Sequence, residues 1–157
     1  MYFDDLTPYA YLQKPLPRVF NVGWLDDCHP INRGTPPPDF ADALRKWSLH
    51  GKANQMRGFQ LCRLCRLEGR QLEGYQQIEI TVEGQKVYLG SAEIWVPSSD
   101  GTIFAAPNLI VHYVEDHSYL PPSRFIDAVL RPVPADWNAA ATAESMIRET
   151  FVRNPHS

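Results

Sequence analysis

The sequence predicts an α+β domain in which three to four helices pack on an antiparallel β-meander pinned by a Cys2His2 zinc site. Three observations support this prediction. Four short strand-like segments, separated by turn residues, occupy residues 76–105. Segments with apolar residues at helical spacing lie on both sides of these strands. A Cys-x-x-Cys motif precedes the strands and a pair of histidines follows them.

The 157 residues fit one domain, or one domain with a tail. We expect residues 1–134 to form a single zinc-stabilised α+β domain and residues 135–157 to be an appended helix and tail. The N-terminus is acidic and lacks the basic start and apolar core of a signal peptide. No apolar run approaches the roughly 20 residues that span a bilayer. These features predict a cytoplasmic protein without membrane contact.

The first half of the chain is expected to contain an arm, a strand, a loop and a helix. Residues 1–17 are rich in aromatic residues and prolines, which favours an extended arm packed on the body. Residues 18–25 alternate in the manner of a first strand, and residues 26–34 form a polar loop. Three prolines then lead into a helix with Phe40, Leu44 and Trp47 on one face, which ends at His50 and Gly51.

The predicted meander consists of four runs, after an extended lead over residues 57–61. The runs cover residues 76–82, 85–89, 92–96 and 102–105. Turn residues separate them at positions 83–84, 90–91 and 98–101. Short alternating runs joined by such turns are typical of consecutive antiparallel strands.

Three helices are predicted after the strands. The first begins at Pro107 or Asn108 and has Leu109, Ile110, Tyr113 and Val114 on its apolar face. A second carries Phe125, Ile126, Val129 and Leu130 and is stopped by Pro132. The last runs from Asp136 to Val152, with Ala140, Ala143, Ile147 and Phe151 as its apolar residues.

Cys62, Cys65, His112 and His117 are the predicted metal ligands. The four residues between the histidines fall within the window of zinc-finger histidine pairs. Five positions on an ideal helix rotate by roughly 140°, so the helix should loosen or end at His117. One alternative is a core histidine at 112 and a helix cap at 117. Another is a redox pair, which normally lies where a strand meets a helix, but no helix is indicated after Cys65.

The predicted role of the metal is structural. Catalytic zinc keeps one coordination position open for water, whereas four protein ligands fill the tetrahedron. Glu115 and Asp116 lie between the histidines, but the spacing differs from the His-Glu-x-x-His motif of metalloproteases. The zinc deaminase signature is also absent from the sequence.

A second set of residues forms a possible binding surface: Asp26 and His29 in the polar loop, and Glu93 and Trp95 on one strand. Glu93 and Trp95 should point to the same side of that strand. An exposed tryptophan beside a carboxylate could bind a ligand, and the loop could perform acid–base or nucleophilic chemistry. An ordinary solvated surface explains the same residues.

Several segments together resemble a family of small uncharacterised bacterial proteins. They are Asn21 to Leu25, Arg57 to Phe59 with Cys62-x-x-Cys65, Gly90 to Ile94, and the run His112-Tyr-Val-x-x-His117-x-Tyr119-x-Pro121-Pro122-x-x-Phe125. The resemblance covers residues 2 to about 130. It implies no activity, and the helix after Pro134 lies outside the shared pattern.

The function predicted from the sequence is that of a non-enzymatic, zinc-stabilised protein-binding or adaptor protein, for example an immunity or regulatory partner. One alternative is a small enzyme that uses the Asp26–His29 loop together with Glu93. Another is nucleic-acid binding through the basic knuckle region, which contains Arg57, Arg63, Arg66 and Arg70. The net charge of -3 argues against nucleic acid, because a polyanion is attracted by a positive field.

Overall fold

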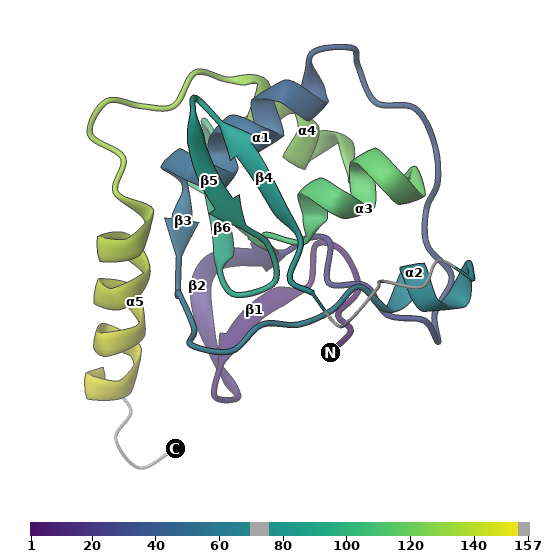
Figure 1. Ribbon diagram of the computed structural model, residues 1–157. Coiled ribbons are helices and arrows are strands. Elements are labelled where there is room, and N and C mark those ends of the chain that lie inside the picture. Colours follow the sequence, from purple (N-terminus) through teal and green to yellow (C-terminus); the bar gives the residue numbers. More distant parts are fainter. Residues whose placement is uncertain (70–75, 154–157) are drawn as a thin grey trace.

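The computed structural model describes residues 1–69 and 76–153, and it has the α+β fold that the sequence predicts. A five-stranded sheet has the order β1-β2-β7-β6-β3, and β4 and β5 form a separate hairpin (Figure 1). The strands are β1 Pro8–Tyr11, β2 Lys14–Asn21, β3 Lys52–Ala53, β4 Glu79–Val82, β5 Gln85–Tyr88, β6 Glu93–Pro97 and β7 Ile103–Pro107. The described residues contain five helices, one more than the upper number expected: α1 Phe40–His50, α2 Arg63–Leu67, α3 Ile110–His117, α4 Ser123–Leu130 and α5 Ala139–Arg153.

The predicted antiparallel meander is wrong, although all four of its runs contain strands. β6 and β7 are antiparallel, but β2 lies parallel to β7, and β5 does not pair with β6. The edge of β6 is occupied by β3, where Lys52 pairs with Ile94. At the break, Gly90 has a φ of 101°, and a side chain there would clash with the carbonyl oxygen of Gln60. The Gly90 turn therefore carries the chain from the hairpin into the main sheet.

The N-terminal arm is more regular than expected, because it contains β1 and the first part of β2. Leu12 and Gln13 both have positive φ and turn the chain between these strands. β2 begins four residues before the predicted start at Arg18. Pro15 and Pro17 precede the segment Val19–Asn21 that pairs with β7, so their missing N–H groups interrupt no bond of that ladder.

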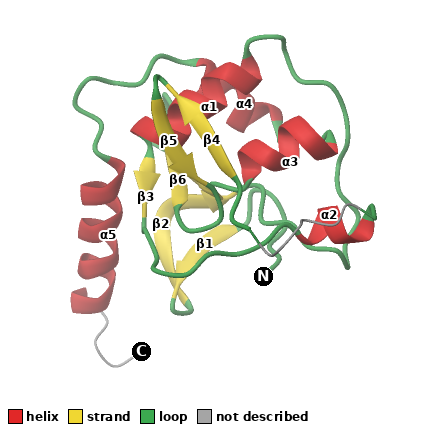
Figure 2. Cartoon of the chain, viewed as in Figure 1, coloured by secondary structure: helices red, strands yellow, loops and turns green. Residues whose placement is uncertain are grey.

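The two faces of the sheet are covered by different helices (Figure 2). Ile94 and Val96 belong to the main core, together with residues of α1, α3 and α4. Trp95 and Ala105 point to the other face, where α5 packs. The buried residues of α5 are Ala139 and Ala143, whereas Ala140 is exposed, contrary to the sequence prediction.

The predicted apolar face and the predicted end of α3 are confirmed. Leu109, Ile110, Tyr113 and Val114 are buried. The helix ends at His117, and Ser118 follows in the left-handed conformation with a φ of 57°. In the described part of the chain, no helix is both long enough and apolar enough to cross a membrane.

Candidate metal centre

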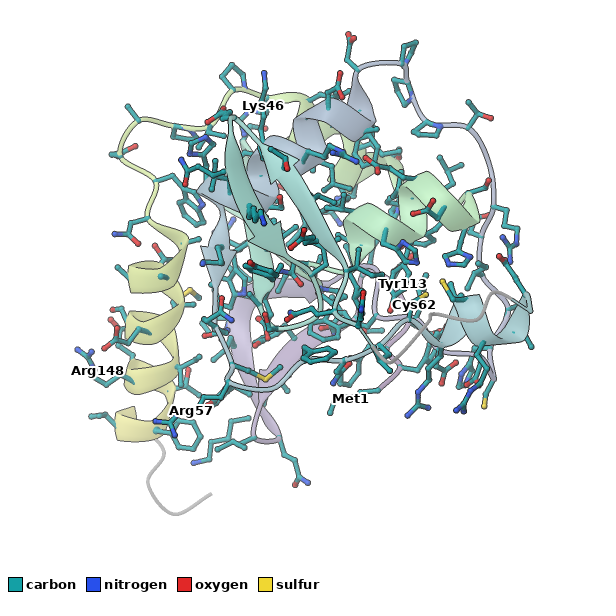
Figure 3. All side chains as sticks on the ribbon, in the orientation of Figure 1. Met1, Lys46, Arg57, Cys62, Tyr113 and Arg148 are labelled. Atoms are coloured by element: carbon teal, nitrogen blue, oxygen red, sulfur yellow. The ribbon has the colours of Figure 1, made fainter. Side chains whose placement is uncertain are left out.

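The two cysteines lie at the start of α2, below α3 in the view of Figure 3. Cys62 is the N-cap residue of this helix, and Cys65 is in its first turn. The predictions from the sequence did not include α2, which spans the knuckle itself and ends two residues after Cys65, at Leu67. Leucine and arginine favour helices, and the buried Leu64 anchors this short one in the core. Because α2 begins at the motif, the helix criterion no longer counts against a redox pair.

The two histidines converge on the two sulfurs from α3. Cys65 Sγ lies 3.2 Å from His112 Nε2 and 3.4 Å from His117 Nε2, and Cys62 Sγ lies 3.4 Å from His117 Nε2. The two Nε2 atoms are 3.2 Å apart. All four donor atoms lie within 4.8 Å of one another, and all four residues are buried. This cluster could hold a metal ion.

Each histidine is oriented by a carboxylate on its other ring nitrogen. His117 Nδ1 lies 2.8 Å from Glu68 Oε2, and His112 Nδ1 lies 2.7 Å from Asp116 Oδ2. A carboxylate on Nδ1 places the proton there and leaves Nε2 as the electron-pair donor. Both Nε2 atoms can therefore donate an electron pair to one cation that lies between them.

Arg33 fixes the outer side of the cluster. Its Nη2 lies 3.2 Å from Glu68 Oε1, and its Nη1 donates to the carbonyl oxygen of His117. The adjacent Gly34 N donates to the carbonyl oxygen of Ser118 at 3.0 Å. Sequence reasoning missed Arg33 and Glu68 as parts of the site. No spacing rule connects Arg33 with His117, which is 84 positions away.

Burial disfavours the thiolate form of Cys62 when no cation is bound. Burial raises the pKa of the Cys62 thiol to about 12; the backbone N–H of Cys65 opposes this rise, whereas the Cys65 thiol adds to it. Redox-active cysteines need a lowered pKa, because the thiolate is the reactive form. A desolvated pair of thiolates instead requires a bound cation to compensate the charge.

Glu93 lies in a hydrogen-bonded cluster away from the metal ligands. Its Oε1 accepts from Tyr9 Oη at 3.0 Å, Asn54 Nδ2 at 2.9 Å and Trp95 Nε1 at 2.9 Å. Glu93 and Trp95 share one side of β6, as predicted, but Trp95 has no exposed surface. The expected contribution of Trp95 to an exposed binding surface is therefore wrong, because α5 and Tyr9 cover it.

Asp26 and His29 interact with each other. Asp26 Oδ1 accepts from the backbone N–H groups of Cys28 and His29 and lies 2.8 Å from His29 Nδ1. The Tyr2 ring stacks on the His29 ring with centroids 3.8 Å apart. The structure thus brings this pair together, whereas the hydrogen bonds described for Glu93 go to a separate set of partners.

Arg63 and Arg66, two of the arginines proposed for nucleic acid, both lie exposed on α2. Arg63 faces Asp27, with Nη1 3.9 Å from Oδ1, whereas Arg57 lies on the segment between β3 and α2 (Figure 3). Arg70 lies outside the described residues.

Fold and site together define an α+β protein with a buried Cys2His2 cluster able to hold a metal ion. The chain belongs to the family DUF7919, described as a domain of unknown function, whose model matches residues 1–130. The resemblance to an uncharacterised family is thereby confirmed, whereas its motif signature and bacterial origin stay predictions. The matched range contains all four candidate ligands and ends with α4. Comparison with curated proteins gave no match, and comparison with solved structures gave none.

Proposed function

We propose that Cys62, Cys65, His112 and His117 bind one zinc ion. The observation that carries this proposal is the spacing of the four donor atoms. A tetrahedral zinc ion with bonds of about 2.3 Å to sulfur and about 2.0 Å to nitrogen separates its ligand atoms by about 3.3 to 3.8 Å. Four of the six separations between the donor atoms, from 3.2 to 3.4 Å, lie close to these edges, and all six are within 4.8 Å. Two thiolates and two imidazoles form a ligand set that suits zinc.

The proposed zinc is structural. Four buried protein ligands leave no coordination position for a water molecule. The ion would join α2, which has only five residues, to α3 across the core. Each cysteine is at least 47 positions from each histidine, so an unfolded chain offers no preformed site. Zinc binding therefore adds to folding stability.

At the level of the whole protein, we propose a non-enzymatic, zinc-stabilised binding or adaptor protein, with another protein as its partner. A closed metal site and the separation of Glu93 from the Asp26–His29 pair support this over an enzyme. Phe59 and Leu67, which flank the knuckle in sequence, have exposed fractions of 44% and 64%, so each offers an apolar side chain to a partner. An immunity or regulatory role is one form that such a protein would take.

The test of the zinc site compares two cysteine variants of protein purified without chelator. Elemental analysis should give one zinc per chain in the parent. Cys65→Ser should lose the metal, lower the melting temperature and become sensitive to protease, because one ligand is removed. Cys28→Ser is the matched control, since Cys28 is exposed and lies outside the cluster. It should keep both metal and stability.

Two results would contradict the proposal. Metal-free parent protein with freely reacting thiols would exclude the site. A Cys65→Ser protein of parental stability that had lost a measurable activity would replace the structural role with a catalytic one.

A further inference from the structure

A cavity of about 330 Å³ lies on a different part of the molecule from the metal ligands. It is formed by the end of α1, by β3, by the segment after β3 and by the β4–β5 hairpin. None of the four candidate ligands lines it, and neither does any residue of the Asp26–His29 loop. Its volume is in the lower part of the range of small-molecule sites, which begins at about 300 Å³.

The lining of the cavity is positively charged. Lys52, Arg57 and Lys86 contribute cations, and no aspartate or glutamate among the described residues lines the cavity. Within residues 1–69 and 76–153, neither Lys52 nor Arg57 forms an ion pair, and Lys86 has only a long contact of 3.9 Å with Glu79. Two cations without an ion pair in these residues, and a third whose ion pair is long, attract an anion to this point, although the chain as a whole is acidic.

Fixed amides and exposed apolar groups complete the wall. Gln55 Nε2 donates to Ser91 O and Oγ, both at 3.1 Å, and Gln77 Nε2 donates to Leu89 O at 3.0 Å. These bonds hold two amide groups in the lining, where they can meet hydroxyl groups. Tyr88 and Met56 are 49% and 53% exposed and supply surface for a ring.

The backbone beneath the cavity is tied down on both sides. Met56 N donates to the carbonyl oxygen of Ser91 at 2.7 Å, and Gln60 N donates to that of Gly90 at 2.9 Å. Arg57 lies between these two bonds, and Figure 3 shows it on the segment between β3 and α2. The backbone at Arg57 is therefore held in place by these two hydrogen bonds even when no ligand is bound.

We propose that this cavity binds a small phosphate monoester that carries a hydroxylated or ring-shaped group, such as a sugar phosphate or a mononucleotide. Arginine and lysine together match the dianionic phosphate group, and the amides and the Tyr88–Met56 wall match the remainder. A long polyanion fits less well, because the net charge of -3 opposes it. The site goes beyond the proposed zinc-dependent function and does not depend on it.

The test is calorimetric titration of the full chain with AMP, glucose 6-phosphate and inorganic phosphate. Adenosine and glucose are the uncharged controls. At least one of the two esters should bind saturably at millimolar concentration or below, more tightly than inorganic phosphate, and the uncharged controls should not bind. The double variant Lys52→Gln/Arg57→Gln should weaken ester binding by at least about tenfold, because two charge-assisted contacts are removed.

A matched variant separates the cavity from general charge effects. Lys46→Gln/Arg131→Gln removes the same charge from two exposed residues outside the lining and should change affinity less than about twofold. Unchanged melting temperatures would show that all variants are folded. The proposal is overturned if neither ester binds, if inorganic phosphate binds as tightly as both esters, or if the two double variants lose affinity equally.

Discussion

Hydrogen-bond partners orient the candidate metal ligands and surround the carboxylate of Glu93. Glu68 and Asp116 each occupy the Nδ1 side of a candidate metal ligand and so direct both Nε2 atoms at the sulfurs. The carboxylate of Glu93 accepts hydrogen bonds from Tyr9, Asn54 and Trp95, and none of these three partners carries a positive charge. Burial, the largest influence, raises the pKa of Glu93 in spite of these donors.

The raised pKa of Glu93 predicts a pH-dependent stability difference. A carboxyl group whose pKa is higher in the folded than in the unfolded chain contributes stability below the unfolded value of about 4.3. This contribution is lost as the pH rises through the folded pKa. Glu93→Gln, which keeps the acceptor oxygen, should therefore remove this decline. Its free energy of unfolding relative to the parent should rise from about pH 4 to neutral pH.

The measurement is urea unfolding of both proteins at several pH values, with the difference between the two curves as the readout. Asp127→Asn is the control, because Asp127 is exposed on α4 and lies outside the Glu93 cluster. Parallel curves for Glu93→Gln and the parent would show that Glu93 has the same pKa in both states.

At the scale of the element, α3 connects the core to the candidate metal site. One face of this helix buries Ile110, Tyr113 and Val114, and its last turn presents His117. The helix ends there because Ser118 adopts the left-handed conformation and its N–H group bonds to the carbonyl oxygen of Tyr113. Packing of the apolar face therefore determines where the two imidazole rings lie.

Val114→Asp tests this dependence. Val114 is 7% exposed and belongs to the main core, so the substitution buries a charge without a partner. We expect a loss of about 3 kcal/mol in the free energy of unfolding, measured by chemical denaturation. Val152→Asp is the matched control, because Val152 is 72% exposed on α5, and its effect should stay within about 0.5 kcal/mol. An equally small effect at Val114 would mean that this face is not packed.

At the scale of the molecule, α5 closes the second face of the sheet. Ala139 and Ala143 pack in the cluster that contains Trp95, and Trp137 Nε1 donates to the carbonyl oxygen of Trp95 at 3.2 Å. The family match ends before this helix begins. The division into a body of residues 1–134 and an appended segment stays a prediction.

Ala143→Arg tests that division. The fully buried Ala143 leaves no room for arginine, so α5 should leave the sheet and expose Trp95. We expect a red shift of tryptophan fluorescence and proteolytic release of the C-terminal segment, while the body keeps one zinc per chain. Ala140→Arg on the exposed side should change neither quantity. Loss of zinc together with the fluorescence shift would show that the body does not fold independently of α5.

The sequence by itself determined the local features. Periodic apolar residues indicated α1, α3, α4 and α5, and alternation with turn residues located β4 to β7. The four candidate ligands were also predictable, because ligand type and local spacing are properties of short segments. The end of α3 at His117 was predicted from helix geometry combined with the requirement that both imidazole rings reach one ion.

Tertiary structure decided which segments pair and which residues are covered. β3, only two residues long, occupies the edge of β6 that a meander would have given to β5, and β2 joins β7 in parallel. Trp95 is buried because α5, more than 40 positions later in the chain, packs on it. Arg33 donates to the carbonyl oxygen of His117, which is 84 positions away. Such contacts depend on where distant segments lie once the whole core is packed. No local pattern of residues encodes which of several segments pairs with a given strand.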